Sequence, residues 1–456
     1  MGDLRNSPLL TDLYQFTMLQ GYLRKGMRGR AAFEFFVRKL PPERNFLVAA
    51  GLDTLLDYLE AVRFTDDDLS SLSKAGNFSQ ELLDYLAGFR FRGDVFAVAE
   101  GMPVFENEPI VRVEADIKEG QLVETRLINL VHFQTLIASK AARCMLAAGE
   151  GTVLVDFGVR RAHAAEAGIL AARAAYIGGF AGTSTVAAAV EFGIPVFGTM
   201  AHSFIEAQVS ESEAFLSFAR ANPSGATLLI DTYDTLKGAE TAVRIAPQLA
   251  EEGISIRGVR LDSGDLESLS REVRKILDRG GLKEARIFAS GNIDEYSILA
   301  LHAAGAPIDG FGVGTRLDTS ADAPYLDSAY KLVEYDGKPR FKKSEGKETY
   351  PGRKQVFRLL TGEKMQEDIL TLAGDRQEGT PLIEKVMSGG RRISPAKGLD
   401  EIARCCREKI RFLPDRLKSL DAASPYPVRI SRSLLELYEA SRRILQSPPS
   451  PDTARE

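Results

Sequence analysis

Residues 195–203 read Pro195-Val196-Phe197-Gly198-Thr199-Met200-Ala201-His202-Ser203, an apolar run typical of a strand that ends on a histidine. Other apolar runs also end on carboxylates, on single charged residues or on glycines, at residues 230–231, 259–265, 288–292 and 310–315. Helical patterns separate these runs, and such an alternation predicts parallel strands joined by right-handed crossovers. Because the carboxyl ends of parallel strands share one edge, we expect the polar groups to gather there, as on the rim of a barrel enzyme.

The alternation also sets the fold class. Six strand–helix units predict an α/β protein with an irregular TIM-like barrel, with strands at residues 153–156, 196–198, 228–231, 256–259, 286–289 and 310–312. A flat, doubly wound sheet is the competing architecture. Earlier in the chain, we expect a helix capped by Thr11 and strands at residues 31–37, 94–98 and 110–113. Within the barrel, Asn292 is the predicted N-cap of the helix that follows the strand at residues 286–289. After Tyr330 the pattern changes to a hairpin around Asp336-Gly337 and helices at residues 400–415 and 431–446.

Composition excludes several classes of protein. The 456 residues are 44% hydrophobic and 27% charged, which suits a globular protein with a large core. A net charge of -5 argues against a nucleic-acid partner held by bulk charge. Three cysteines make no disulfide framework and favour a reducing compartment. The sequence shows neither a signal peptide nor a good membrane span, so we expect a cytoplasmic protein without a membrane partner.

His202 is the histidine with the most informative position among the four in the chain. A histidine after a buried strand is most often a satisfied core or rim residue, but Thr199 and the glycine before it favour a site. Asp231, at the end of the next strand, is predicted to fix the tautomer of the imidazole. Ser203 is a candidate substrate contact. A Ser-His-Asp hydrolase is a weaker interpretation, because no Gly-x-Ser-x-Gly elbow is present.

Two further groups indicate an anionic ligand. Strand alternation places Arg260 and Asp262 on one face. They are either a structural ion pair or two ligand contacts. In the second case, Arg260 would bind a carboxylate or phosphate of the ligand, and Asp262 would bind a ribose hydroxyl or Mg²⁺. Arg160 follows another strand end and is either a solvated charge or a second anion contact. Glycine-rich strand ends resemble the phosphate site of a barrel, with tight turns as the alternative, and their candidate residues are Gly291, Asn292, Gly314 and Thr315.

Five ordered motifs carry a resemblance to a known family. They are residues 11–18 (Thr-Asp-Leu-Tyr-Gln-Phe-Thr-Met), 157–161 (Phe-Gly-Val-Arg-Arg), 198–203 (Gly-Thr-Met-Ala-His-Ser), 260–265 (Arg-Leu-Asp-Ser-Gly-Asp) and 349–352 (Thr-Tyr-Pro-Gly). In this order the chain resembles the nicotinate phosphoribosyltransferases over residues from about 8 to 360. The resemblance implies an irregular barrel at residues 125–334 and an α+β domain built from residues 1–124 and 335–456.

The resemblance also implies a reaction and its partners. Nicotinate is joined to 5-phosphoribosyl 1-diphosphate with Mg²⁺, giving nicotinate mononucleotide and diphosphate for NAD synthesis. ATP hydrolysis is coupled to this ligase-type transfer through a phosphohistidine. Members of the family are typically homodimers with active sites at the subunit interface.

Residue roles are carried over motif by motif. His202 is the implied phosphorylated residue, and Tyr14 of the neighbouring subunit would stack on the pyridine ring. Thr199 and Arg260 would lie at the nicotinate site, and Thr349 would touch the phosphoribosyl substrate. The ribose and 5-phosphate contacts would be Asp262, Gly291, Asn292, Gly314 and Thr315. Many relatives carry an aspartate and an asparagine where this chain has Ala181 and Thr185, so no polar role is assigned to these two positions.

Three alternatives remain from the sequence. A sister transferase could use nicotinamide or quinolinate. A barrel aldolase or isomerase would need a Schiff-base lysine, and no predicted strand ends in one. A non-catalytic protein that binds NAD precursors is the third, and the presence of His202 with Arg260 and Asp262 argues against it.

Overall fold

A computed structural model describes residues 6–343 and 349–446 of the chain. The chain divides into two compact units, the first made of Met1–Leu136 with Tyr325–Glu456 and the second of Ile137–Pro324. Helix α6 (Glu124–Ala148) begins in the first unit and ends in the second. Within the described ranges, no helix has the length and apolar character needed to cross a membrane.

The second unit is built on a parallel sheet. Its strand order is β7-β6-β11-β10-β9-β8, and each neighbouring pair is parallel. The strands are β6 (Val153–Asp156), β7 (Gly182–Thr183), β8 (Ala226–Leu229), β9 (Ile256–Leu261), β10 (Arg286–Ala289) and β11 (Gly310–Val313). The helices are η2 (Val159–Arg161), α7 (Ala165–Ile177), α8 (Val186–Phe192), α9 (His202–Glu206), α10 (Glu211–Ala221), α11 (Thr235–Glu251), α12 (Leu266–Arg279), α13 (Glu295–Ala303) and α14 (Thr315–Asp318).

The predicted alternation is confirmed for five of the six strands, and the sixth is wrong. Val196 makes only an isolated bridge to Thr183 in the described chain, and the strand at this place is β7. The reason is exposure, because Val196 is 58% exposed and Phe197 38%, so this apolar run does not enter the core. Strands β7 and β8 form the two edges of the described sheet, which is therefore a parallel half-barrel.

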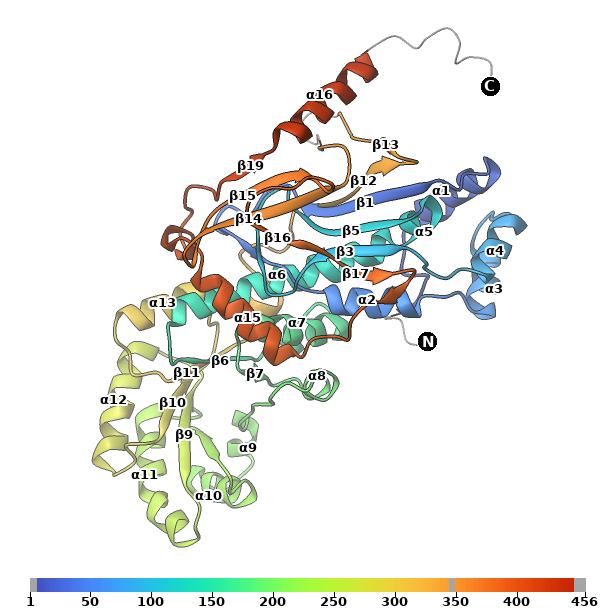
Figure 1. The fold of residues 1–456 in the computed structure, drawn as a ribbon. Coiled ribbons are helices and arrows are strands. Elements are labelled where there is room, and N and C mark those ends of the chain that lie inside the picture. Colours follow the sequence, from blue (N-terminus) through green and yellow to red (C-terminus); the bar gives the residue numbers. More distant parts are fainter. Residues whose placement is uncertain (1–5, 344–348, 447–456) are drawn as a thin grey trace, which may run out of the picture. The chain divides into compact units, whose positions relative to one another are not determined.

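Apolar side chains spaced for helices and strands form the core of this half-barrel. Val259 on β9 and Ile287 on β10 are fully buried, and Val273 and Leu277 place one face of α12 in the same cluster. Helices α11 and α12 pack side by side and against these strands (Figure 1). Helix α12 ends at a glycine pair, with Gly280 as its cap and Gly281 in the left-handed region at φ +81°.

Two predicted helix caps are one or two residues out of place. Helix α13 is capped by Asp294, whose Oδ1 accepts a hydrogen bond of 2.9 Å from the backbone N–H of Ser297. Asn292 has a φ of +52° and belongs to the preceding turn, so it cannot serve as this cap. Helix α1 (Leu13–Arg24) has Asp12, not Thr11, at its N-cap position.

The first unit is largely antiparallel. Its seven-stranded sheet has the order β13-β12-β1-β5-β3-β17-β18, and a four-stranded sheet has the order β16-β14-β15-β19. The strands are β1 (Arg30–Val37), β2 (Leu47–Val48), β3 (Asp94–Val98), β4 (Pro103–Val104), β5 (Pro109–Asp116), β12 (Ser328–Tyr335), β13 (Lys338–Pro339), β14 (Lys354–Thr361), β15 (Lys364–Leu372), β16 (Thr380–Pro381), β17 (Ile383–Ser388), β18 (Arg391–Arg392) and β19 (Val428–Ile430). The remaining helices are α2 (Leu52–Ala61), α3 (Asp66–Ala75), α4 (Gln80–Ala87), α5 (Ile117–Leu122), α15 (Leu399–Arg411), η3 (Asp415–Lys418) and α16 (Arg432–Gln446).

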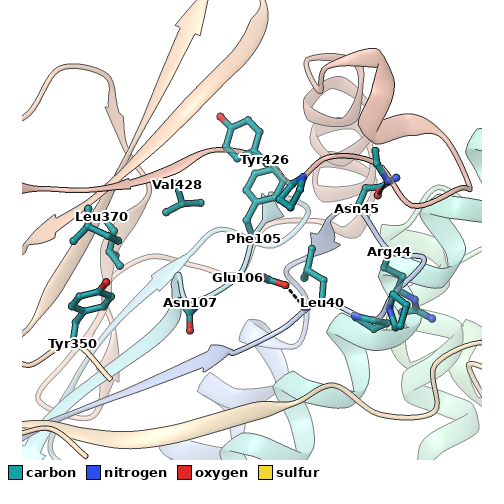
Figure 2. A pocket seen from close by; sticks show the side chains of 15 residues that line it. Leu40, Arg44, Asn45, Phe105, Glu106, Asn107, Tyr350, Leu370, Tyr426 and Val428 are labelled. Atoms are coloured by element: carbon teal, nitrogen blue, oxygen red, sulfur yellow. Dashed lines mark hydrogen bonds between the residues drawn. The ribbon is translucent and has the colours of Figure 1, made fainter. Parts of the chain in front are cut away.

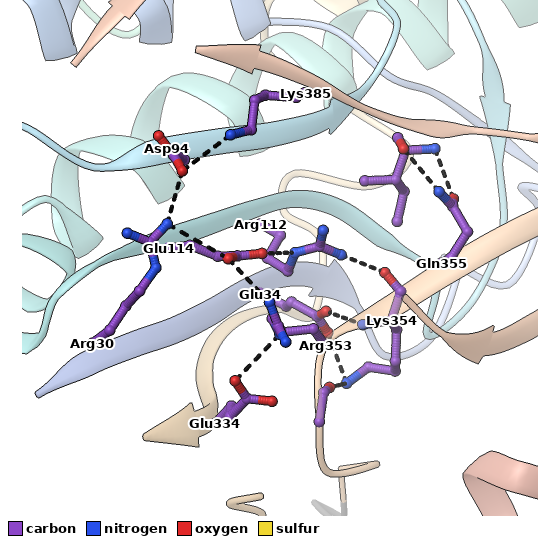
Figure 3. Close-up of polar contacts among 12 residues, drawn as sticks. Arg30, Glu34, Asp94, Arg112, Glu114, Glu334, Arg353, Lys354, Gln355 and Lys385 are labelled. Carbon is purple, nitrogen blue, oxygen red and sulfur yellow. Dashed lines mark hydrogen bonds and ion pairs between the residues drawn. The ribbon is translucent and has the colours of Figure 1, made fainter. Parts of the chain in front are cut away.

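A network of charged side chains extends across the seven-stranded sheet (Figure 3). At its buried end, the Nζ of Lys354 lies 2.7 Å from Oε2 of Glu34, and both side chains are at most 5% exposed. The same Nζ donates hydrogen bonds of 2.8 Å to the carbonyls of Tyr350 and Gly352. Burial lowers the pKa of Lys354 although Glu34 beside it favours the charged form. This ammonium therefore fixes the turn that carries the predicted site residue Thr349.

We predict that Lys354→Met lowers the free energy of unfolding by about 3–5 kcal/mol, because it leaves the carboxylate of Glu34 buried and unpaired. Arg353→Met is the matched control. Arg353 is 45% exposed in its ion pair with Glu334, and an exposed pair contributes about 0–1 kcal/mol. Urea unfolding at neutral pH measures both values, and equal losses in the two variants would contradict the buried-pair interpretation.

Candidate active site at the carboxyl ends of the parallel strands

The guanidinium of Arg260, on β9, is held by side chains that follow β6, β9 and β10 and by Thr199 from the loop before α9. Its Nε donates a hydrogen bond of 2.8 Å to Oγ of Ser290, and Nη1 donates one of 3.0 Å to Oγ1 of Thr199. Nη2 lies 2.8 Å from Oδ1 of Asp262, and the ring of Phe157 is 5.4 Å from the guanidinium carbon. Arg260 and Asp262 thus share a face of the strand as predicted. One N–H of Nη2 has no acceptor among the described residues.

Asp262 is the counter-ion of this cation. Its Oδ1 also accepts a hydrogen bond from the hydroxyl of Ser290. Partial burial by itself raises the pKa of Asp262, but the hydrogen bonds from Ser290 and Arg260 and the charge of Arg260 outweigh burial and hold the pKa below its usual range. The carboxylate is therefore ionised, and 30% of it is open to solvent.

His202 lies on the other side of the same carboxylate. Its Nε2 is 3.9 Å from Oδ2 of Asp262, and its Nδ1 is 3.1 Å from the hydroxyl of Thr232. The side chain is 39% exposed and begins the short helix α9. Because the imidazole and the guanidinium flank one carboxylate, the predicted gathering of these groups in one site agrees with the structure.

Asp231 takes a different place from the predicted one. Its Oδ2 accepts hydrogen bonds of 2.8 Å from the backbone N–H of Asp262 and 2.7 Å from the hydroxyl of Ser263. The imidazole of His202 faces Thr232 and Asp262 instead. The expectation that Asp231 fixes the histidine tautomer is therefore wrong, and Asp231 braces the loop after β9.

A cavity of about 510 Å³ opens beside Arg260 and Asp262. Seven of the predicted site residues line it, contributed by the ends of β6, β9, β10 and β11: Arg160, Arg260, Asp262, Gly291, Asn292, Gly314 and Thr315. Arg161 and Ser263 also line it. Three arginines around one cavity suit an anion, and glycines at its wall let backbone N–H groups approach. Ser203 is exposed on α9 outside this lining, and Thr199 reaches the site through its bond to Arg260.

Two predicted site residues belong to the first unit. Tyr14 lies on α1 and is 44% exposed, and partial burial followed by the charge of Glu124 raises the pKa of Tyr14 to about 12. Thr349 is 7% exposed, and its hydroxyl accepts a hydrogen bond of 3.3 Å from the backbone N–H of Lys342. The structure places them in their own unit, and their roles stay predictions.

The first unit also has a cavity of its own, of about 450 Å³ (Figure 2). The stacked rings of Phe105 and Tyr426, with centroids 3.9 Å apart, form part of its wall together with Tyr350. Oε1 of Glu106 accepts a hydrogen bond of 2.9 Å from the backbone N–H of Leu40 there. None of the predicted site residues lines this cavity.

Sequence reasoning missed three contributors to the site around Arg260. Ser290 directly precedes the predicted Gly291, and Thr232 directly follows the predicted Asp231, so proximity to a strand end could have found both. Phe157 also follows a predicted strand and opens the motif at residues 157–161, but an aromatic residue in that place is usually core, so no site role is assigned to it. Thr185, where the family pattern is not matched, has a buried hydroxyl without a partner among the described residues.

Comparisons with known proteins agree with this geometry. Models of the nicotinate phosphoribosyltransferase family match residues 9–132 (N-terminal domain), 152–355 (family model) and 375–438 (C-terminal domain). Nicotinate phosphoribosyltransferase pncB2 of Mycobacterium tuberculosis is 51% identical over 93% of this chain and 91% of its own length. The chain belongs to the nicotinate phosphoribosyltransferase family, which is a family of enzymes.

Two further relatives agree with this assignment. Nicotinate phosphoribosyltransferase of Bacillus subtilis is 46% identical over 77% of this chain and 73% of its own. The crystal structure of human nicotinic acid phosphoribosyltransferase superposes with a TM-score of 0.85 at 29% identity, covering 94% of this chain and 99% of that one. The family that the five motifs indicate is thus confirmed.

We predict that Gly291→Ala displaces Asp262 and lowers both stability and activity. Gly291 has a φ of +92°, and a Cβ there would lie 2.0 Å from the carbonyl oxygen of Asp262. The matched control is Gly281→Ala, where φ is +81° but nothing lies within 4 Å of the added carbon. Both variants bear the strain of a left-handed alanine, so Gly291→Ala should lose at least about 1 kcal/mol more in thermal or urea unfolding. A larger loss in the Gly281 variant would show that the contact with Asp262 is unimportant.

Proposed function

We propose that this enzyme joins nicotinate to 5-phosphoribosyl 1-diphosphate, giving nicotinate mononucleotide and diphosphate. The observation that carries the proposal is Arg260, a mostly buried cation with one free N–H in the described chain, at the wall of a cavity whose other arginines suit phosphate. Named relatives at 51% and 46% identity support the same reaction.

The chemistry needs positioning and charge stabilisation. The lone pair of the pyridine nitrogen forms a bond to the anomeric carbon while the bond from that carbon to diphosphate breaks, and diphosphate leaves with the electron pair. The pyridine nitrogen carries no proton at neutral pH, so no general base is needed. The protein's part is to orient the two reactants and stabilise an oxocarbenium-like centre. The carboxylate of Asp262, 30% exposed, is suited to hold a ribose hydroxyl.

Arg260 gives the proposed substrate its orientation and its specificity. Its free Nη2 N–H would bind the carboxylate of nicotinate, with the hydroxyl of Thr199 beside it. The ring of Phe157 covers the guanidinium, so water is partly excluded from this contact. Nicotinamide lacks the negative charge and would leave the cation incompletely paired. Gly291, Asn292, Gly314 and Thr315, with Arg160, would hold the phosphoribosyl end.

His202 is the proposed phosphorylated residue through which ATP hydrolysis is coupled. Its imidazole is 39% exposed, so it can receive a phosphoryl group, and Thr232 orients the Nδ1 side. In the transfer, the histidine nitrogen would form a bond to the γ-phosphorus of ATP as ADP leaves, and water would later take the phosphoryl group as phosphate. The charge of phosphohistidine beside Asp262 would then organise the diphosphate pocket.

Mg²⁺ fits the donor set of this site. The described residues hold no cluster of three or more metal-ligating side chains, so the oxygens of the diphosphate would supply most of the ligands. The ionised carboxylate of Asp262 is the protein oxygen suited to complete them. When bound, Mg²⁺ neutralises the charge of the diphosphate.

The assembly, complete architecture and compartment are also part of the proposal. A homodimer would bring the partner's Tyr14 onto the pyridine ring, and the exposed Val186 and Val190, one helical turn apart on α8, suit burial against a second copy. The half-barrel is proposed as part of an irregular TIM-like barrel. All three cysteines are free thiols, which supports a reducing cytoplasmic location.

An assay of the wild-type chain with 5-phosphoribosyl 1-diphosphate and Mg²⁺ tests the function. Nicotinate, nicotinamide and quinolinate are offered in turn, with and without ATP, and the nucleotide, ADP and phosphate are measured. We expect nicotinate mononucleotide as the main product, formed faster with ATP. We expect His202→Asn to keep slow, ATP-independent synthesis and to lose phosphate release.

The outcomes separate the alternatives. Preferred use of nicotinamide or quinolinate would assign the chain to a sister reaction, and binding without any product would indicate a non-catalytic protein. Undiminished phosphate release in His202→Asn would remove the histidine from the coupling step, while leaving the transfer reaction in place.

A further inference from the structure

Two buried carboxyl groups meet behind the wall of the anion cavity. Asp156, at the end of β6, is 0% exposed, and Asp318, at the end of α14, is 1% exposed. Both carboxyl groups contact Gly158: Asp156 accepts a hydrogen bond from its backbone N–H, and the carboxyl group of Asp318 packs against its α-carbon. Neither belongs to the cavity lining, and the proposed reaction gives them no part.

The two carboxyl groups have different surroundings. Asp156 accepts a hydrogen bond of 2.7 Å from the backbone N–H of Gly158 and one of 2.6 Å from the hydroxyl of Thr183. Among the described residues, no N–H or O–H group donates to either oxygen of Asp318. A buried carboxylate without donors is strongly disfavoured, whereas a protonated carboxyl can donate to the oxygen of a neighbouring carboxylate.

The fit around Asp318 is tight. A Cβ on Gly158 would lie between 2.2 and 2.5 Å from the carboxyl atoms of Asp318, so only glycine lets the chain pass there. Gly158 leads directly into η2, which carries Arg160 and Arg161. Asp318 therefore contacts the backbone from which both exposed arginines of the cavity extend.

The charges nearby favour one shared proton. Burial first, and then the negative charge of Asp156, raise the pKa of Asp318 well above its ordinary value. Burial also raises the pKa of Asp156, although hydrogen bonds from Thr183, Gly158 and Asp318 oppose it. Charged side chains on the elements packed around α14 are Arg160 and Arg161 on η2, Glu166 and Arg173 on α7, and Arg316 on α14 itself, and none of these offsets the effect of Asp156 on Asp318.

We propose that Asp156 and Asp318 share one proton and act as a positioning pair that ties the arginine turn at residues 158–161 to the loop of Gly314 and Thr315. Asp318 ends the helix that Thr315 begins, and Asp156 holds the N–H that starts the turn. Both segments line the anion cavity. The shared proton also keeps a second negative charge away from the phosphate that this cavity binds, and this step rests on the proposed function.

The pair predicts a dependence on pH. The folded chain holds the proton of Asp318 more tightly than the unfolded chain does. At pH values between the ordinary carboxyl pKa and the raised pKa of the folded state, folding therefore takes up a proton. Stability contributed by this proton is present at low pH and falls as pH rises through that window. Loss of the proton would also loosen the arginine turn and weaken binding of 5-phosphoribosyl 1-diphosphate.

Asp318→Asn and Asp318→Leu test the proposal, with Asp278→Asn, an exposed carboxylate on α12, as control. Asparagine keeps a hydrogen-bond donor toward Asp156, and leucine does not. We expect the KM for 5-phosphoribosyl 1-diphosphate to rise on the order of tenfold to a hundredfold in the leucine variant and to stay within about twofold in the asparagine variant. As pH rises from about 5 to 9, the wild-type KM should increase and that of Asp318→Asn should stay flat.

Urea unfolding over the same pH range separates this proposal from the proposed function, because it needs no activity. We expect the wild type to lose stability relative to Asp318→Asn as pH rises, and Asp278→Asn to follow the wild type. Parallel pH profiles of the wild type and Asp318→Asn in unfolding would overturn the shared proton. Equal KM values in the leucine and asparagine variants would overturn the positioning role. If the wild type forms no nucleotide, the proposed function fails while the unfolding profiles still decide the pair.

Discussion

The proposed site depends on one guanidinium that is held by groups from several loops at the carboxyl edge of the parallel sheet. Arg260 is bonded by Thr199, Ser290 and Asp262 and covered by Phe157, and only a parallel arrangement brings these segments to one edge. A cation held by neutral hydroxyls and a single ionised carboxylate keeps attraction for an external anion. His202 lies 3.9 Å from the other oxygen of the same carboxylate, so the proposed nucleotide transfer and the proposed phosphorylation would share one charged group.

The structure uses carboxyl groups in two opposite ways around this centre. Asp262 receives hydrogen bonds from a hydroxyl and a cation, and these hold its pKa down. Asp318 is buried next to the carboxyl group of Asp156, and both burial and the charge of Asp156 raise the pKa of Asp318. In the proposed site, the ionised carboxylate of Asp262 would lie where a ribose or a metal ion binds, and the protonated carboxyl of Asp318 would keep negative charge away from the phosphate.

Most of the second unit follows from sequence pattern, because strand ends and apolar periodicity are local signals. The strands at residues 153–156 and 286–289 have the predicted bounds, and the face shared by Arg260 and Asp262 follows from alternation. The failures have nonlocal causes. Val196 reads as a core strand residue but lies at the exposed edge of the sheet. Asp231 lies at the expected strand end, yet tertiary contacts turn its carboxylate toward the loop of Asp262.

Buried polar contacts between segments distant in the sequence could not be predicted from sequence patterns. Lys354 and Glu34 are 320 positions apart, and Asp318 meets Asp156 only because β11 lies next to β6 in the sheet. Neither pair has a motif. Each becomes visible once the strand order is known. Lys354 holds the segment that carries Thr349, and the aspartate pair is proposed to hold the segments that carry Arg160 and Thr315.

The most direct measurement of the central claim is the ratio of kcat/KM for nicotinate to that for nicotinamide, in the wild type, in Arg260→Met and in Arg161→Met. Arg161 also lines the cavity but takes no part in the bonded cluster around Arg260. If Arg260 binds the nicotinate carboxylate, its loss should lower this ratio by at least about tenfold, because a charge-assisted hydrogen bond is lost for one substrate only. The Arg161 variant should keep the wild-type ratio. Equal losses for both substrates in Arg260→Met would contradict the account.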